Sequence, residues 1–239
     1  MMDKRRAKPL ILHGLAAAQH ELHPALVHSL QNAGLDLAAT DSAGWTALHA
    51  AAMIGDAAAI RCILGLGEKG NGGAVKNASN AIIEARRKGG WRALHLATHG
   101  GHLAAVEELL LANADVDARL DDSDDALTPL HIATGQGHAD ILDIFLQCGA
   151  DPRLLTHHLR RSPLHIAVAA GHERCVRLLL GRPDLMDIVD GDGLTAVKLA
   201  CIVSSDAKSR PIQQEIIALL EAHQPFGATP PTHMQSLLG

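Results

Sequence analysis

The sequence is nearly devoid of aromatic side chains: its 239 residues include two Trp, two Phe and no Tyr. Strands of sandwiches and barrels favour aromatic and β-branched residues, so this scarcity argues against those folds. Base-stacking side chains and a positive charge are also missing, since the net charge is −5, and we therefore expect no nucleic-acid partner. No apolar run reaches the roughly 18 residues that span a bilayer, so we expect no membrane segment.

A six-residue pattern recurs along the chain. Its clearest copy, Thr-Pro-Leu-His-Ile-Ala, begins at Thr128, and the other copies begin at Thr46, Arg92, Ser162 and Thr195. The His of the pattern, or its equivalent, falls at 49, 95, 131, 165 and 198, which gives a period of 33 residues with one insertion of about 13. In the first four copies a Gly follows six residues after the His, and apolar residues at helical spacing come next. This pattern predicts repeated pairs of helices.

These T-P-L-H-x-A, G-H and G-A-D elements resemble those of the ankyrin-repeat family over about nine tenths of the chain. The resemblance implies an all-α solenoid of stacked helix–turn–helix units with loop or hairpin tips, in which each unit covers the apolar face of its neighbour. We expect an ankyrin-repeat domain over 1–224 and a disordered tail over 225–239. We expect an insertion at about 68–86 and about six units, of which the first and last are divergent capping repeats. The units are about 9–40, 41–73, 87–120, 121–156, 157–189 and 190–224.

The pattern itself has a physical basis. Thr or Ser before a helix is an N-cap, whose hydroxyl accepts from otherwise unpaired backbone N–H groups. Arg92 offers no such hydroxyl, so the helix after it is expected to start less firmly. Cys62, Cys148, Cys175 and Cys201 are widely spaced among apolar residues, which predicts buried reduced thiols. The alanines at 16–18 would suit a signal-peptide cleavage site, but they are in phase with the repeat. We therefore expect the protein to be located in the cytoplasm, with the nucleus as the alternative.

Metal and nucleotide sites are not expected, although the chain has 16 His. The repeated His residues lie about 33 residues apart along a solenoid and cannot converge on one ion. For the motif His, the resemblance implies a structural hydrogen bond to the repeat's own backbone or Thr hydroxyl. Residues 65–70 spell G-x-G-x-x-G, but a dinucleotide site needs a strand before it, and here a helix is predicted. We therefore expect no cofactor, no metal and no catalytic residues, and interpret the chain as a non-enzyme.

The position just before each N-cap is the leading candidate for partner binding. In ankyrin repeats it is variable and faces the surface, and here both tryptophans of the chain occupy it. Trp and Arg are the residues that most often dominate interface energetics. One hypothesis is a row of partner-binding side chains along a concave rim; the other is that each Trp packs over its own hairpin. The row comprises Trp45, Trp91, Leu127, Arg161 and Leu194.

Charged residues gather on the same loops. An acidic tip, with Asp121, Asp122, Asp124 and Asp125, lies in sequence between basic segments that contain Arg86 and Arg160. Either neighbouring tips neutralise each other, or the acidic tip steers a basic partner. Both interpretations stay open at this point.

The sequence thus favours a monomeric protein-interaction module, acting as a scaffold, adaptor or inhibitor, which binds an unidentified protein through the concave surface of hairpins and first helices. The alternatives are a secreted, host-directed ankyrin effector and the accessory subunit of a separate enzyme.

Overall fold

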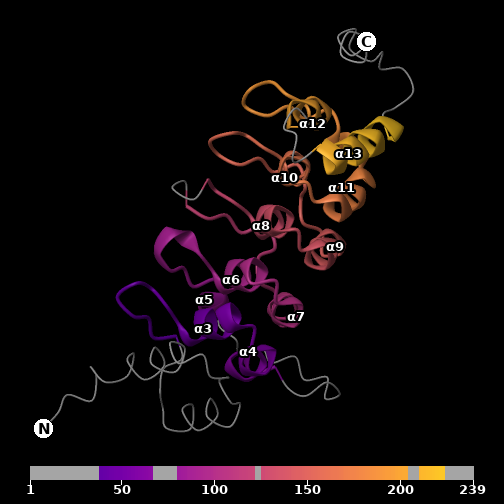
Figure 1. Ribbon diagram of the computed structural model, residues 1–239. Coiled ribbons are helices and arrows are strands. Elements are labelled where there is room, and N and C mark those ends of the chain that lie inside the picture. The colour runs from indigo at the N-terminus through magenta and orange to yellow at the C-terminus, as the bar shows by residue number, and fades with distance from the viewer. Residues whose placement is uncertain (1–37, 67–79, 122–124, 204–209, 224–239) are drawn as a thin grey trace, which may run out of the picture.

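The computed structural model describes residues 38–66, 80–121, 125–203 and 210–223. In these segments the chain forms helix pairs stacked in chain order (Figure 1). The first helices of the pairs lie side by side in an inner row, and the second helices form an outer row. The inner row consists of α3 (Ala47–Ile54), α6 (Ala93–His99), α8 (Pro129–Gln136), α10 (Pro163–Ala170) and α12 (Ala196–Val203). The outer row consists of α4 (Ala57–Leu64), α7 (Leu103–Leu111), α9 (Ala139–Gln147), α11 (Glu173–Leu180) and α13 (Arg210–Ala222).

Small side chains allow the inner helices to pack closely. The last Ala of each six-residue pattern is fully buried in all five inner helices. The Leu of the clearer copies is likewise buried, with Leu48, Leu130 and Leu164 at 0% exposure. Since an alanine presents only a methyl group, adjacent helices can approach without voids, which explains how the chain forms a continuous core with so few aromatic residues. The predicted all-α repeat solenoid is therefore confirmed.

Each inner helix starts and stops by local chemistry. The hydroxyls of Thr46, Thr128 and Ser162 accept from the N–H of the His three residues later, as an N-cap requires. Gly137 ends α8 with a φ of 76°, and a Cβ added there would lie 2.8 Å from the ring of His172 in the next unit. Glycine is needed at this turn both for the left-handed backbone and for the close approach of the neighbouring unit.

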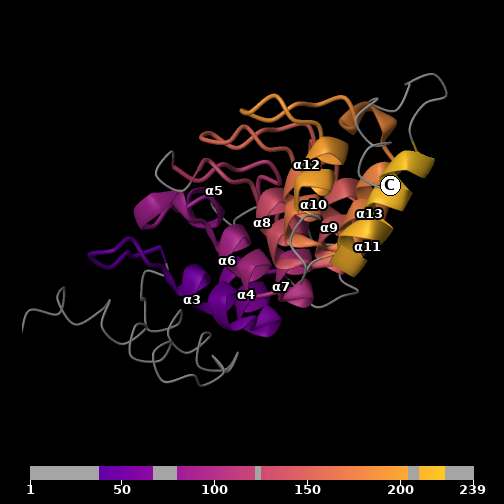
Figure 2. The same ribbon diagram turned by 45° about the horizontal axis from the view of Figure 1, so that its top comes forward.

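The loops that precede the inner helices project on one side of the stack and lie one behind another (Figure 2). We call these five segments the tip row: 41–46, 86–92, 118–128 where described, 154–162 and 190–195. Each tip from the second to the fifth donates one backbone hydrogen bond to the tip before it. The bonds join Lys88 N–H to Ala43 O, Asp121 N–H to Gly89 O, His157 N–H to Asp125 O and Gly191 N–H to Leu159 O, at 2.8–3.1 Å. The tips thus form one hydrogen-bonded series along the stack.

The insertion contributes a short helix, α5 (Asn80–Ile83), whose Ile83 is buried in the core. Short 3-10 turns η1 (Lys88–Gly90) and η3 (Pro183–Leu185) lie in the connecting segments. Of the expected features, the first unit up to residue 37, the tail from 225 and much of the insertion fall outside the described residues. In the part that the structure describes, no helix is both long and apolar enough to cross a membrane.

The four cysteines are free thiols. The prediction that all are buried is right for Cys175, where burial raises the pKa of the thiol to about 11. It is wrong for Cys148, which is exposed. Cys148 lies at the end of α9 as its C-cap residue, where apolar neighbours in sequence no longer fix the direction of the side chain.

Candidate functional site

The motif histidines hold each tip to the inner helix row. In α3, Nδ1 of His49 accepts from the Thr46 N–H at 3.2 Å and lies 2.8 Å from the Thr46 hydroxyl. Its Nε2 lies 3.1 Å from the carbonyl oxygen of Trp91 in the next tip. A carbonyl only accepts, so Nε2 carries the proton and the ring is neutral. The same arrangement links His95 to Ala118 O, His131 to Leu154 O and His165 to Leu194 O.

Burial keeps these rings neutral. It lowers the pKa of His95 to about 3 and the pKa of His131 to about 4. Burial also lowers the pKa values of His49 and His165, against the opposing effect of the backbone carbonyls that they contact. The structural role that the sequence resemblance implied for these residues is confirmed, and the structure adds that each ring bridges two successive units.

The structure places the five residues before the N-caps at equivalent positions. Each lies at the end of its tip and is half-buried. The backbone carbonyl of each accepts a hydrogen bond from the opposite arm of its own loop, at 2.9–3.1 Å, and this bond closes the loop. The five side chains therefore recur once per unit along the tip row: Trp45, Trp91, Leu127, Arg161 and Leu194.

Both tryptophans also make contacts within the chain. Trp45 packs edge-on against His49, with 6.1 Å between ring centroids, and Trp91 packs in the same way against His95 and His99. The guanidinium of Arg87 lies 4.6 Å from the Trp45 ring and 5.5 Å from the Trp91 ring, so it joins the two by cation–π contacts. Each indole thus packs on the inner helix that follows it and remains partly exposed on the tip row. From the sequence, Arg87 is only one of the basic residues of its tip, because nothing in the repeat pattern places it between the two rings.

The acidic tip is partly neutralised by neighbouring tips. Asp121 is exposed and lies 3.7 Å from Arg86 of the preceding tip. Asp125 accepts from the backbone N–H of His158, and its carboxylate lies 3.0 Å from Nδ1 of that ring. Burial raises the pKa of Asp125, but the hydrogen bonds from His158 outweigh it and leave the pKa below its usual value. Asp122 and Asp124 lie outside the described residues.

A second network anchors the insertion. Arg92, at the N-cap of α6, turns its buried guanidinium toward Glu84, with 3.0 Å between Nε and Oε2. The same Glu84 accepts from the N–H of Asp115 at 2.9 Å. The N-cap N–H of Arg92 still donates to Nδ1 of His95, as in the units with Thr. The repeat pattern does not predict this pairing, because Glu84 lies in the insertion and has no counterpart in the other units.

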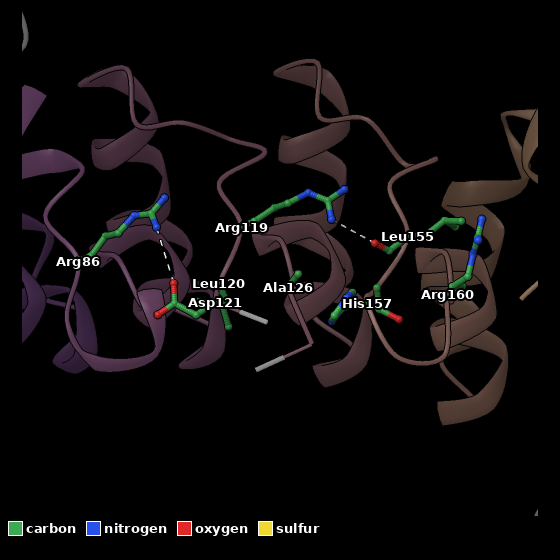
Figure 3. Close-up of a pocket in the computed structure, with 9 residues that line it drawn as sticks. Arg86, Arg119, Leu120, Asp121, Ala126, Leu155, His157 and Arg160 are labelled. Carbon is green, nitrogen blue, oxygen red and sulfur yellow. Dashed lines mark hydrogen bonds and ion pairs between the residues drawn. The ribbon is translucent and has the colours of Figure 1, made fainter. Parts of the chain in front are cut away.

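A groove of about 680 Å³ runs across three successive tips (Figure 3). Its charged lining consists of Arg86, Arg119, Asp121 and Arg160, and His157 lies beside them. Arg119 donates to the carbonyl of Leu155 at 3.2 Å, and Arg160 is exposed at the turn of its tip. Among the described residues no group of three or more His, Cys, Asp or Glu side chains is placed to hold a metal ion. The G-x-G-x-x-G segment begins directly after α4, as expected, and not after a strand.

Comparison with known proteins matches the chain to a family described as ankyrin repeats (3 copies), over residues 14–119, 68–156 and 130–220. The Drosophila melanogaster protein named NF-kappa-B inhibitor cactus is 32% identical over 176 residues, which cover 72% of this chain and 31% of that protein. The ankyrin repeat and KH domain-containing protein CBG24701 of Caenorhabditis briggsae is 34% identical over 107 residues, 44% of this chain and 4% of its own length. The chain therefore spans about a third or less of these relatives.

Proposed function

The chain belongs to the ankyrin-repeat family, and we propose that it works as a protein-binding module without catalytic activity, which holds a protein partner on the concave surface of tips and inner helices. The observation that carries the proposal is the tip row itself. Backbone hydrogen bonds join each tip to the next, and a half-buried Trp, Leu or Arg recurs at one position of each tip. A surface that is ordered before binding loses little conformational entropy when a partner docks.

The proposed biological role is that of a scaffold, adaptor or inhibitor in the cytoplasm, acting as a monomer. Of these roles, inhibitor is the word in the name of the cactus relative, which aligns with most of this chain. The alternative of a secreted effector gains no support from the described residues, because the candidate secretion signals lie in segments outside them. No observation on the described residues favours the other alternative, an enzyme's accessory subunit.

Alanine substitutions along the tip row test this role. A partner would be isolated with the full chain from extract of the producing cell, and its affinity measured by titration calorimetry. We expect Leu127→Ala and Trp45→Ala each to weaken binding by about 1–2 kcal/mol, as for residues that dominate an interface. Leu111→Ala, on outer helix α7 at 65% exposure, is the matched control and should bind as the wild type does.

The tryptophan variants also separate the two interpretations of that residue pair. If Trp45→Ala and Trp91→Ala lower the unfolding midpoint in urea but leave the affinity unchanged, the indoles only pack on their hairpins. If Leu127→Ala also leaves the affinity unchanged while Leu111→Ala weakens it, the partner binds the outer helices and the proposed surface is wrong.

A further inference from the structure

One arginine from each of three successive tips lines the groove described above. Arg86 precedes α6, Arg119 precedes α8 and Arg160 precedes α10, and they follow one another along the stack (Figure 3). All three side chains are exposed. They occupy different positions in their tips, six residues before the N-cap for Arg86, nine for Arg119 and two for Arg160, so the groove receives one arginine from each tip without a regular spacing.

Two of the three arginines form no ion pair with the residues that the structure describes. Arg86 lies 3.7 Å from Asp121, and that carboxylate is the single acidic group in the groove lining that the structure describes. Arg119 donates to the neutral carbonyl of Leu155 and forms no ion pair with any described residue. Arg160 makes no ion pair with any described residue. Two guanidiniums are therefore available to an anionic ligand, each with donors arranged for bidentate contact with a carboxylate.

The floor of the groove is apolar and its shape is fixed. Leu120 and Ala126 are buried beneath the arginines. The bonds from Asp121 N–H to Gly89 O and from His157 N–H to Asp125 O hold the three tips together. Arg160 has a φ of 48°, a left-handed conformation that non-glycine residues seldom adopt and that tends to persist where surrounding structure fixes it.

We propose that this groove binds an extended acidic segment of the protein partner, whose carboxylates pair with Arg119 and Arg160. The inference rests on the proposed protein-binding function and names the chemistry of what is bound. An extended peptide suits a groove that crosses successive tips, with alternate side chains facing the arginines. A nucleic acid fits less well, because the described lining of the groove contains no Trp, Tyr or Phe ring on which bases could stack.

Fluorescence anisotropy with the full chain and synthetic probes tests the proposal. The probe is a fluorescein-labelled peptide that alternates Glu and Ala over about ten residues, since an extended chain of that length covers roughly 33 Å. Matched probes carry Gln or Lys in place of Glu, and an oligothymidylate of similar length represents nucleic acid. We expect the Glu probe to bind about tenfold more tightly than the Gln probe, because each exposed ion pair contributes roughly 0.2–1 kcal/mol.

Variants assign the binding to the two arginines. Arg119→Gln with Arg160→Gln should abolish the preference for Glu over Gln, and Arg160→Gln alone should reduce it about threefold. The second variant guards against a folding effect, because Arg160 makes no ion pair in the described structure. Arg174→Gln is the control: that arginine lies on outer helix α11, 2.9 Å from Asp140, and its loss should leave the preference intact.

Four results would overturn the inference: equal affinity for the Glu and Gln probes, an unchanged preference in the double variant, tighter binding of the Lys probe, or equally tight binding of oligothymidylate. Failure of the inference remains distinct from failure of the proposed function. If the Glu probe does not bind but Leu127→Ala lowers the affinity for the partner, the tip row binds protein by other contacts. If the probe binds but the tip substitutions leave the affinity for the partner unchanged, the protein-binding role assigned to the tips is wrong.

Discussion

Acidification should destabilise this protein through its buried histidines. The perturbation is a change from about pH 7 to about pH 5, a range in which most carboxylates stay ionised while unfolded His, with a pKa near 6.5, becomes protonated. In the folded protein, burial lowers the pKa of His95 to about 3 and that of His131 to about 4. Their stabilising effect is therefore complete above about pH 6.5 and is lost as the pH falls toward the folded values.

The size of the loss follows from proton uptake. For each such His, the free energy of unfolding falls by about 1.4 kcal/mol per pH unit below 6.5. At pH 5 the loss is therefore about 2 kcal/mol for each His and about 4 kcal/mol for the pair. His49 and His165, whose pKa values are also lowered, add to this loss. A total stability of about 5–15 kcal/mol makes the effect large.

Urea unfolding followed by circular dichroism at several pH values measures it. His131→Gln should reduce the loss between the two pH values by about 2 kcal/mol. The control is Thr134→Val in the same helix, which removes the buried hydrogen bond from Thr134 Oγ1 to Leu130 O. It should lower the free energy of unfolding equally at both pH values. A pH slope that is the same in His131→Gln and the wild type would refute the assignment of neutral bridging rings.

Two further predictions concern how units are joined. Gly137→Ala should cost about 3 kcal/mol in urea unfolding, from the left-handed backbone and the overlap with His172, whereas Gly149→Ala should cost about half of that. Gly149 has a φ of 88° with no atom within 4 Å of an added Cβ, so equal losses would show that the contact with His172 is unimportant. Glu84→Gln should lower stability by about 2 kcal/mol by removing the nearer of the two carboxylates beside buried Arg92, the other being Asp115 at 4.0 Å. Adding Arg92→Thr should recover part of the loss in the same assay, because Thr restores an N-cap hydroxyl; a Glu84→Gln variant as stable as the wild type would contradict this pairing.

The repeat motif was sufficient to predict the helices because its information is local. An N-cap at Thr128, Pro129 at the first helical position and Gly137 at the end define α8 without reference to the rest of the fold. The equivalence of Trp45 and Trp91 could be predicted for the same reason, since both lie at a fixed distance before an N-cap.

Contacts between tips could not be predicted in this way. The position of Arg87 between two indoles and the pairing of Glu84 with Arg92 depend on where the insertion returns to the stack, and the insertion has no repeat phase. The groove likewise arises only when three tips are set side by side, so the sequence showed Arg160 as one charge among several. Its separation from any acidic partner among the described residues is a property of the assembled row.

Hydrogen–deuterium exchange of the full chain, with and without its isolated partner, tests most directly whether the tip row is the binding surface. The account predicts that the partner slows exchange at 86–92, 118–121 and 154–162 while the backbone of outer helices α7, α9 and α11 exchanges as in the free protein. Protection confined to the outer helices, with the tips unchanged, would contradict it.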